Sequence, residues 1–96
     1  KDAPKPGEGP SREKRENGNY DVLFCADVDN KVIKASVAGD MDPGYGSTSK
    51  MITESAVCLL KEADDLPGGI YTPASSLGKR LIKRLQDNAG LTFKVE

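Results

Sequence analysis

A short stretch of glycines and hydroxyl side chains offers the sharpest chemistry in this sequence. It covers residues 43 to 50, PGYGSTSK, at the predicted start of a helix. The first backbone N–H groups of a helix lack intrahelical partners, so they can receive an anion, and Lys50 would add positive charge. We take Gly44, Tyr45, Ser47, Thr48 and Lys50 as candidate substrate-facing residues. The simpler interpretation is a tight turn and a helix that Ser47 or Thr48 caps.

The spacing of these glycines fits no nucleotide-binding motif. A P-loop needs Gly-x-x-x-x-Gly-Lys-Ser/Thr, and a dinucleotide fold needs Gly-x-Gly-x-x-Gly behind a strand. Neither pattern occurs in the 96 residues. We therefore expect no cofactor bound by this chain itself.

Other polar groups invite weaker hypotheses. Tyr71 and Thr72 precede Pro73 at a second helix start, where a substrate carbonyl could meet either hydroxyl, although capping by Thr72 explains them more simply. Arg15 could bind an anion through its planar guanidinium or lock its own loop onto the domain, and we favour locking. The acidic pairs, such as Asp64 with Asp65 and Asp40 with Asp42, lack the spacing of a calcium loop, and turn and helix-end chemistry explains them better.

The cysteines and the overall charge exclude several classes of site. The chain has no histidine, and Cys25 and Cys58 lie far apart, which leaves neither a zinc site nor a Cys/His nucleophile. Both are expected to be buried, reduced thiols. With 14 basic and 15 acidic residues there is no field to attract nucleic acid, so the basic residues 79, 80, 83 and 84 indicate a solvated helix face.

Alternating apolar residues predict a β-hairpin over residues 20 to 38. Tyr20, Val22 and Phe24 share one face of the first strand, and Asp29-Asn30 tolerates the positive φ of a two-residue turn. A helix follows from residue 49 to 63, and its apolar positions are expected to pack against the sheet: Ile52, Ala56, Leu59, Leu60 and Ala63.

The remaining chain predicts a second helix and a last strand. The helix runs from Pro73 to about Asp87 with Thr72 as its cap, and the strand covers residues 91 to 95. The helix's apolar stripe is Leu77, Leu81, Ile82 and Leu85. We predict an α+β fold, β-β-α-α-β, with about three mostly antiparallel strands and two helices on one face. Residues 1 to 18, rich in proline and glycine, form a loop or mobile arm, and residues 19 to 96 form the domain.

The ordered segments of this chain resemble the C-terminal part of the saccharopine-dehydrogenase-like oxidoreductases, a family that includes trans-acting enoyl reductases. No single segment is diagnostic, and the resemblance rests on their order along nearly the whole chain. The segments are KPGEGPS at 5 to 11 with Arg15 and Gly18, DPGYG at 42 to 46, TSKM at 48 to 51, ESA at 54 to 56 with Leu59, LP and GG at 66 to 69, TPA at 72 to 74, LG at 77 and 78, LI at 81 and 82, RL at 84 and 85, and GLTF at 90 to 93.

The resemblance implies a larger parent protein. In that family an N-terminal Rossmann domain binds NAD(P), and a second α+β domain builds the substrate pocket and often the dimer contact. This chain would be the end of the second domain, inactive alone, with the rest of the parent and a second copy as partners. The link from residue 39 to 43 is slightly longer, and the turn from 66 to 69 slightly shorter, than the family pattern.

A second class of function remains open from the sequence. The sheet edge or the basic helix could dock a partner, which would make the chain a non-catalytic protein- or membrane-interaction module. We expect an intracellular and primarily cytoplasmic protein, with a lipid-droplet or membrane surface as the alternative suggested by animal members of the family.

Overall fold

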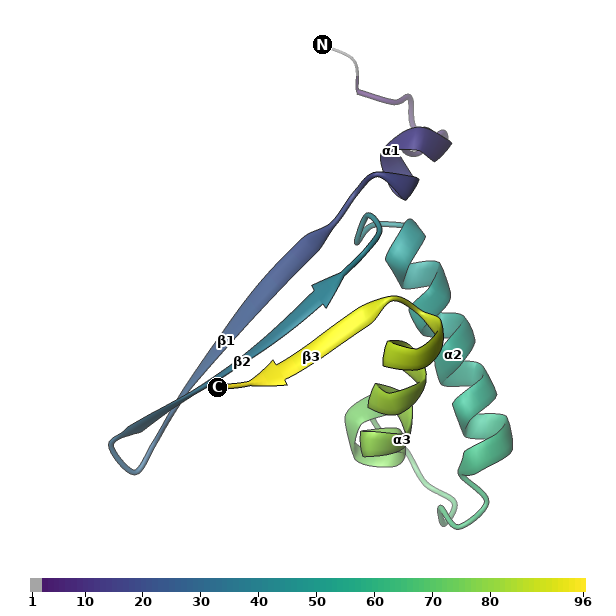
Figure 1. The fold of residues 1–96 in the computed structure, drawn as a ribbon. Coiled ribbons are helices and arrows are strands. Elements are labelled where there is room, and N and C mark those ends of the chain that lie inside the picture. Colours follow the sequence, from purple (N-terminus) through teal and green to yellow (C-terminus); the bar gives the residue numbers. More distant parts are fainter. Residues whose placement is uncertain (1–2) are drawn as a thin grey trace.

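The computed structural model describes residues 3 to 96; Lys1 and Asp2, the start of the predicted arm, lie outside this range. Three strands and two long helices follow in the predicted order, and a five-residue helix precedes them within the segment predicted as a loop or arm (Figure 1). The elements are α1 (Arg12–Glu16), β1 (Tyr20–Val28), β2 (Lys31–Gly39), α2 (Gly46–Glu62), α3 (Pro73–Asn88) and β3 (Leu91–Val95). The predicted α+β class is confirmed.

The β1–β2 hairpin forms as its turn residues predict. Asp29 and Asn30 have φ angles of 50° and 60°, and this left-handed pair matches the twist of the flanking strands. The pairing places Val28 opposite Lys31 and Tyr20 opposite Gly39. The second strand therefore ends one residue later than predicted, at Gly39.

The three strands form an antiparallel sheet in the order β1-β2-β3. Because side chains alternate along a strand, the register divides the sheet into two faces. The apolar sheet face carries Tyr20, Val22, Phe24, Ala26, Val28, Lys31, Ile33, Ala35, Val37, Leu91, Phe93 and Val95. The mixed sheet face carries Asp21, Leu23, Cys25, Asp27, Val32, Lys34, Ser36, Ala38, Thr92 and Lys94.

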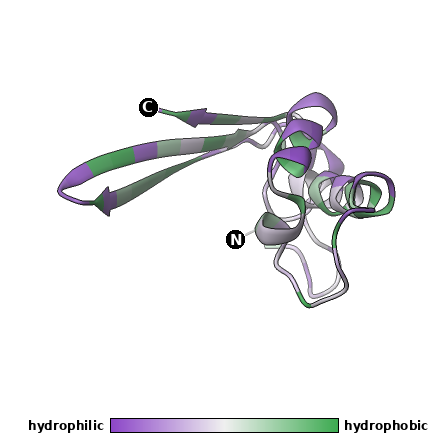
Figure 2. Cartoon of the chain, turned by 90° about the horizontal axis from the view of Figure 1, so that it is seen from below, coloured by the Kyte–Doolittle hydropathy of each residue, from purple (hydrophilic) through white to green (hydrophobic). Residues whose placement is uncertain are grey.

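A small core joins α3 to one end of the sheet. Leu77, Leu81 and Leu85 of α3 are buried together with Cys58 of α2 and Leu91 of β3, and Val37 and Phe93 pack against this cluster. The other end of the hairpin reaches past the helices (Figure 2). The core therefore covers only the inner part of the apolar sheet face.

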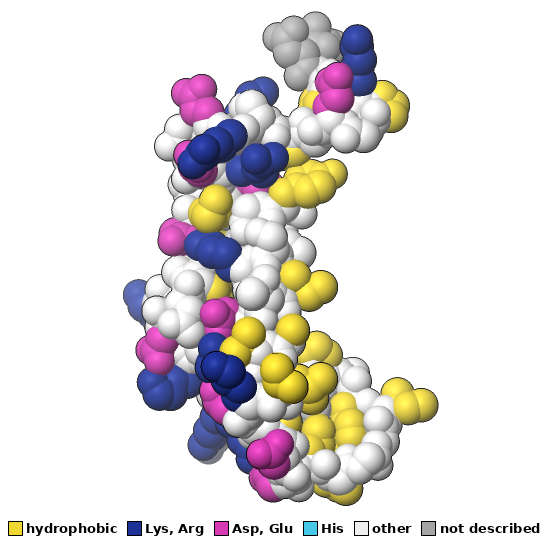
Figure 3. All heavy atoms as spheres, turned by 90° about the vertical axis from the view of Figure 1, so that its right-hand side faces the viewer, with side chains coloured by type: hydrophobic (Ala, Val, Ile, Leu, Met, Phe, Trp, Pro, Cys, Tyr) yellow, Lys and Arg dark blue, Asp and Glu magenta, His cyan; other side chains and the backbone are white. Residues whose placement is uncertain are grey.

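The expected packing of α2 on the sheet is wrong. Ile52, Leu59 and Leu60 are 68%, 56% and 78% exposed. Figure 3 views the molecule from the α2 side and shows hydrophobic side chains at the surface, most densely toward one end. Helix α2 instead lies along α3 and turns toward it a less apolar stripe of covered residues: Met51, Glu54 and Cys58.

Helix α3 has the predicted start and most of the predicted stripe. Thr72 is its N-cap residue, and the Thr72 backbone N–H donates to the Ser75 hydroxyl at 3.1 Å. Ile82 is 39% exposed and lies outside the buried stripe. Gly78 interrupts the helix with φ 47° and ψ −126°, a conformation open essentially to glycine alone.

The two cysteines differ in environment. Cys58 is buried in the core, and burial is the main cause that raises the pKa of its thiol. Cys25 is exposed on the mixed sheet face, where its neighbours on β1 are exposed too, so the expectation that it is buried is wrong. Both cysteines are free thiols. Across the same residues, no helix has the length and apolarity needed to span a membrane.

Candidate functional site

The turn before α2 is organised by the carboxylate of Asp42. It accepts hydrogen bonds from the backbone N–H groups of Gly44 at 3.0 Å, Tyr45 at 3.2 Å and Gly46 at 2.6 Å. The bond from Gly46 is the main cause that lowers the pKa of Asp42; partial desolvation opposes it, while the other two bonds and the charge of Arg15 add to it. The N–H groups of Gly46, the first residue of α2, and of the two residues before it thus receive a carboxylate of the same chain, where the sequence suggested an external anion.

Asp42 takes part in turn and helix-end chemistry, as expected for the acidic pair Asp40 and Asp42, but its three backbone partners were not predicted. The signal was present as Asp42-Pro43-Gly44, because aspartate side chains commonly accept bonds from backbone N–H groups two residues on. Ser47 and Thr48, the residues expected to cap α2, make different contacts. The Thr48 hydroxyl donates to the carbonyl of Pro43, and Ser47 is directed into the fold.

Ser47 lies in the interior of the domain. Its side chain is fully buried, and its Oγ lies 2.8 Å from the phenolic oxygen of Tyr20. The Tyr20 ring lies over Gly39, its cross-strand neighbour, where any added Cβ would overlap the ring. The hydroxyl of Ser47 therefore ties β1 to α2 and is not available to a substrate in this structure.

The other candidate residues lie at the surface. Gly44, Tyr45 and Thr48 are exposed, and the Lys50 ammonium pairs with Asp40 at 2.7 Å. The start of α2 therefore presents a phenol, a hydroxyl already engaged with the backbone, and a lysine engaged in a salt bridge.

Arg15 connects the N-terminal segment to the turn before α2. Its Nη1 donates to the carbonyl of Pro10 at 3.2 Å, and its own backbone carbonyl accepts from the N–H of Asp42 at 3.0 Å. These contacts hold residues 10 to 15 against the domain. They are the contacts expected of a loop-locking residue, and anion binding by Arg15 stays a prediction.

The candidate residues line two separate open hollows. The first, about 380 Å³, lies between α1 and the start of α2 and brings Arg15 and Tyr45 together. It is completed by Arg12, Glu16, Met41, Gly46 and Ser49, and the Arg12 guanidinium bonds Glu16 at 2.6 Å. The second, about 240 Å³, is lined by Lys50, Ser49, Thr53, Glu54 and Asn88. The sequence-based set is thus adjacent but does not surround one cavity.

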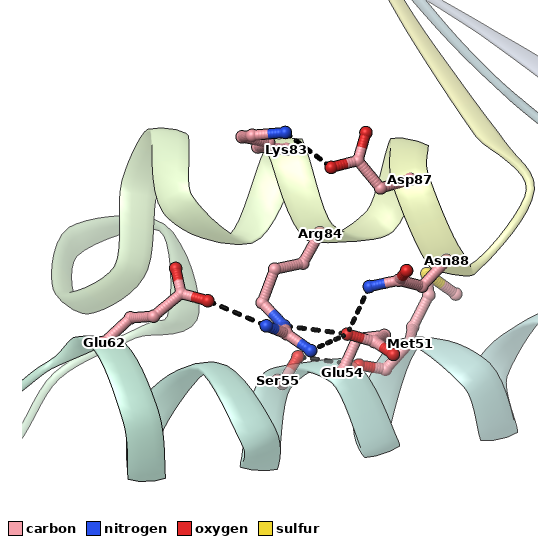
Figure 4. Close-up of polar contacts among 8 residues, drawn as sticks. All are labelled: Met51, Glu54, Ser55, Glu62, Lys83, Arg84, Asp87 and Asn88. Carbon is pink, nitrogen blue, oxygen red and sulfur yellow. Dashed lines mark hydrogen bonds and ion pairs between the residues drawn. The ribbon is translucent and has the colours of Figure 1, made fainter.

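The polar residues between α2 and α3 form a structural network (Figure 4). Arg84 of α3 reaches between two carboxylates of α2, bonding Glu54 at 2.7 Å and Glu62 at 2.7 Å. Asn88 adds a bond to Glu54 at 3.2 Å. The bond to Glu62 is the main cause that raises the pKa of Arg84. This network holds the helices together at partly buried positions.

The basic residues of α3 are largely engaged within the molecule. Arg80 makes a two-pronged contact with Asp65 at 2.7 and 2.6 Å, and Lys83 pairs with Asp87 at 2.6 Å. These ion pairs lie on the expected solvated helix face, where Lys79 and Lys83 are exposed.

Comparison with known proteins gives matches to curated sequences only, because no protein-family model and no solved structure matches the chain. A Mycobacterium tuberculosis protein provisionally named a trans-acting enoyl reductase is 38% identical over 85 residues. Trans-acting enoyl reductases of Mycobacterium bovis and Mycobacterium ulcerans are 34% and 35% identical over 85 residues. Each match covers 85% of this chain and 20% of the relative. Over most of its length the chain is therefore similar to one fifth of the trans-acting enoyl reductases, which relates it to oxidoreductases.

Proposed function

We propose that this chain is the C-terminal part of an NAD(P)-dependent oxidoreductase of the saccharopine-dehydrogenase-like class. It contributes substrate-pocket or dimer structure and is inactive alone. The observation that carries the proposal is the similarity to trans-acting enoyl reductases over 85% of the chain. The chain spans only a fifth of their length, and in this proposal the dinucleotide and the reacting centre lie in the remaining four fifths.

The residues present do not fit a dinucleotide. The sequence contains no glycine fingerprint of that kind, and the N–H groups at the start of α2 are already bonded to Asp42. NAD(P), when bound elsewhere in the parent, would supply the hydride. What this chain can supply is shape and orientation around a substrate.

The hollow between α1 and α2 is the proposed pocket wall. Arg15 stands at its edge as a guanidinium anchored by the Pro10 carbonyl, and Tyr45 offers a largely exposed ring and phenol. An enoyl substrate is an apolar chain ending in a polar carbonyl, so a ring beside a cation would orient it. Gly44, Thr48 and Lys50 flank this wall, whereas Ser47 supports it from inside.

The first experiment tests whether NADPH binds to this chain or only to the full-length protein. The isolated chain and the full-length protein are each titrated with NADPH while the nicotinamide fluorescence is followed. We expect saturable binding by the full-length protein alone. Saturable binding by the isolated chain would overturn the division of roles, and its absence from the full-length protein would overturn the oxidoreductase assignment.

A second experiment tests the pocket wall in the full-length protein. Tyr45→Ala should raise KM for an enoyl thioester by about tenfold, the loss expected for one substrate-orienting contact, while the NADPH affinity stays unchanged. Ile70→Ala, which truncates a fully exposed apolar side chain outside this hollow, is the control. An unchanged KM in Tyr45→Ala would exclude this wall from the substrate site.

A non-catalytic interaction module is the second candidate. An almost wholly apolar hollow of about 310 Å³ lies between α2 and the start of α3, with walls from Ile52, Leu59, Tyr71, Pro73 and Leu77. Exposed apolar hollows of this kind commonly mark protein or lipid contacts. This candidate predicts a full-length protein without NADPH binding, so the fluorescence titration distinguishes the two.

A further inference from the structure

We propose that the outer half of the apolar sheet face is the docking surface for amphipathic α-helices contributed by the rest of a longer polypeptide. This inference rests on the proposed function, in which the chain is one part of a larger protein. It adds the surface through which that part joins the remainder and the kind of structure that covers it.

Burial falls from one end of the apolar sheet face to the other. At its inner end Leu91 is 4% exposed, and Val37 and Phe93 pack against the core. In the next row toward the hairpin turn Phe24 is 54% and Val95 is 79% exposed, and Ile33 and Val28 beyond them are 47% and 49% exposed. The same apolar surface therefore begins inside the core and continues uncovered. Such a surface resembles a domain core cut in half more than an ordinary protein surface.

The distribution of charged residues over the two sheet faces indicates that the covering layer makes an apolar contact that excludes water. Lys31, at the hairpin turn, carries the only charged side chain on the apolar sheet face. The mixed sheet face carries Asp21, Asp27, Lys34 and Lys94 on the same three strands. One side of the sheet is thus suited to water and the other to apolar contact, because burying an unpaired charge is costly. The partner must present an apolar stripe without charges.

The existing layer indicates that the partner is helical. Helix α3 already covers the inner end of the apolar sheet face through Leu81 and Leu85, which pack with Leu91. Helices on one face of an antiparallel sheet form a common two-layer arrangement, and further helices beside α3 would continue the layer over Phe24 and Ile33. The curated relatives carry four fifths of their length outside the matched region, enough chain to supply them.

Two neighbouring residues allow a matched test. Cys25 lies on the mixed sheet face and Ala26 on the apolar sheet face, and both are exposed. One reporter is the natural Cys25, and the other is Ala26→Cys in a Cys25→Ser background. Cys58 is buried in both and serves as the unreactive background thiol. Labelling by a maleimide is followed by mass spectrometry in the isolated chain and in the full-length protein of its gene, over a range of protein concentrations.

We expect both reporters to react at similar rates in the isolated chain. In the full-length protein the Ala26→Cys reporter should react at least about tenfold more slowly at every concentration, because labelling would require opening of the covered face, while Cys25 changes less. Full reactivity of the Ala26→Cys reporter in the full-length protein would overturn the proposal, as would a gene product that adds no chain to these 96 residues.

Other partners on the apolar sheet face would give different labelling patterns. Protection that appears in the isolated chain as its concentration rises would identify a second copy as the occupant, and protection that requires phospholipid vesicles would identify a membrane. Either result overturns the helical layer. The result is independent of cofactor binding: a full-length protein that protects the Ala26→Cys reporter but binds no NADPH would sustain this inference and overturn the proposed oxidoreductase.

Discussion

The phenolic oxygen of Tyr20 lies 2.8 Å from the Oγ of Ser47, and this contact joins the first residue of β1 to the first turn of α2. Ser47 is fully buried, so water cannot replace the phenol as its partner. The contact positions the start of α2, where the proposed pocket wall lies.

Removing one partner should therefore destabilise the domain. Tyr20→Phe leaves a buried hydroxyl without a hydrogen bond, which costs about 1–3 kcal/mol. Urea unfolding measures the loss, and Tyr45→Phe, at an exposed phenol, should change stability little. Adding Ser47→Ala to Tyr20→Phe should cost less than the two single changes summed; strict additivity would show that the hydroxyls do not interact.

Stability should fall in acid partly because of Asp42. Its pKa is lowered in the folded chain, mainly by the bond from Gly46, so its contribution is complete above the ordinary value of 3.8 and is lost as the pH drops through the lowered native pKa. Asp42→Asn should lower stability at pH 7 and flatten the acid limb of the stability profile. Urea midpoints from pH 2 to 7 test this, with Asp64→Asn as the control; an unchanged acid limb would contradict it.

Any side chain at position 78 should strain the backbone and lower the stability of the domain. Gly78→Ala places an L-residue at φ 47° and ψ −126°, and such strain costs about 1–3 kcal/mol even though nothing lies within 4 Å of the new methyl group. Gly68→Ala, also in open space and without a positive φ, should be close to neutral. Equal unfolding midpoints for the two variants would show that α3 is regular at this point in solution.

The small core should be sensitive to single truncations. Leu81→Ala removes a buried side chain shared by α3, α2 and β3 and should cost about 2–5 kcal/mol, enough to leave the isolated chain largely unfolded. Leu60→Ala, at a 78% exposed position of α2, should leave stability within about 0.5 kcal/mol of the parent. Circular dichroism during thermal unfolding compares them. A folded, equally stable Leu81→Ala variant would place the core elsewhere.

The network around Arg84 should contribute more than the surface ion pairs. Glu54→Gln removes a carboxylate that Arg84 and Asn88 share at partly buried positions, whereas Asp87→Asn removes the exposed partner of Lys83. We expect the larger drop in urea midpoint for Glu54→Gln and a weaker dependence of that drop on salt, because exposed pairs are screened. The reverse order would mean that the network forms without stabilising the helix pair.

The strands and α3 could be predicted because local pattern and final packing agree there. Tyr20, Val22 and Phe24 alternate in sequence and share a face in the sheet, and the Asp29-Asn30 pair fixes the turn. The stripe of Leu77, Leu81 and Leu85 is buried as its spacing predicts. In these elements each residue is specified by neighbours close in sequence.

The packing partner of helix α2 could not be predicted from its sequence pattern. Its most apolar stripe, with Ile52 and Leu59, is expected to face the sheet, yet the covered stripe carries Met51 and Cys58 because α2 packs on α3. Periodicity identifies a helix but not its partner. Turn chemistry at Asp42 follows from the sequence, but its three backbone partners do not, since they depend on the three-dimensional form of the turn.

The aspartates of β1 have a consequence for solubility. β1 is an edge strand whose backbone groups are open to another chain, and its YDVLFCADV sequence is rich in residues that favour strand stacking. Parallel, in-register stacking of two copies would bring Asp21 against Asp21 and Asp27 against Asp27, with uncompensated repulsion at both ends of the strand. We therefore expect these two carboxylates to disfavour parallel, in-register stacking at the exposed edge of β1.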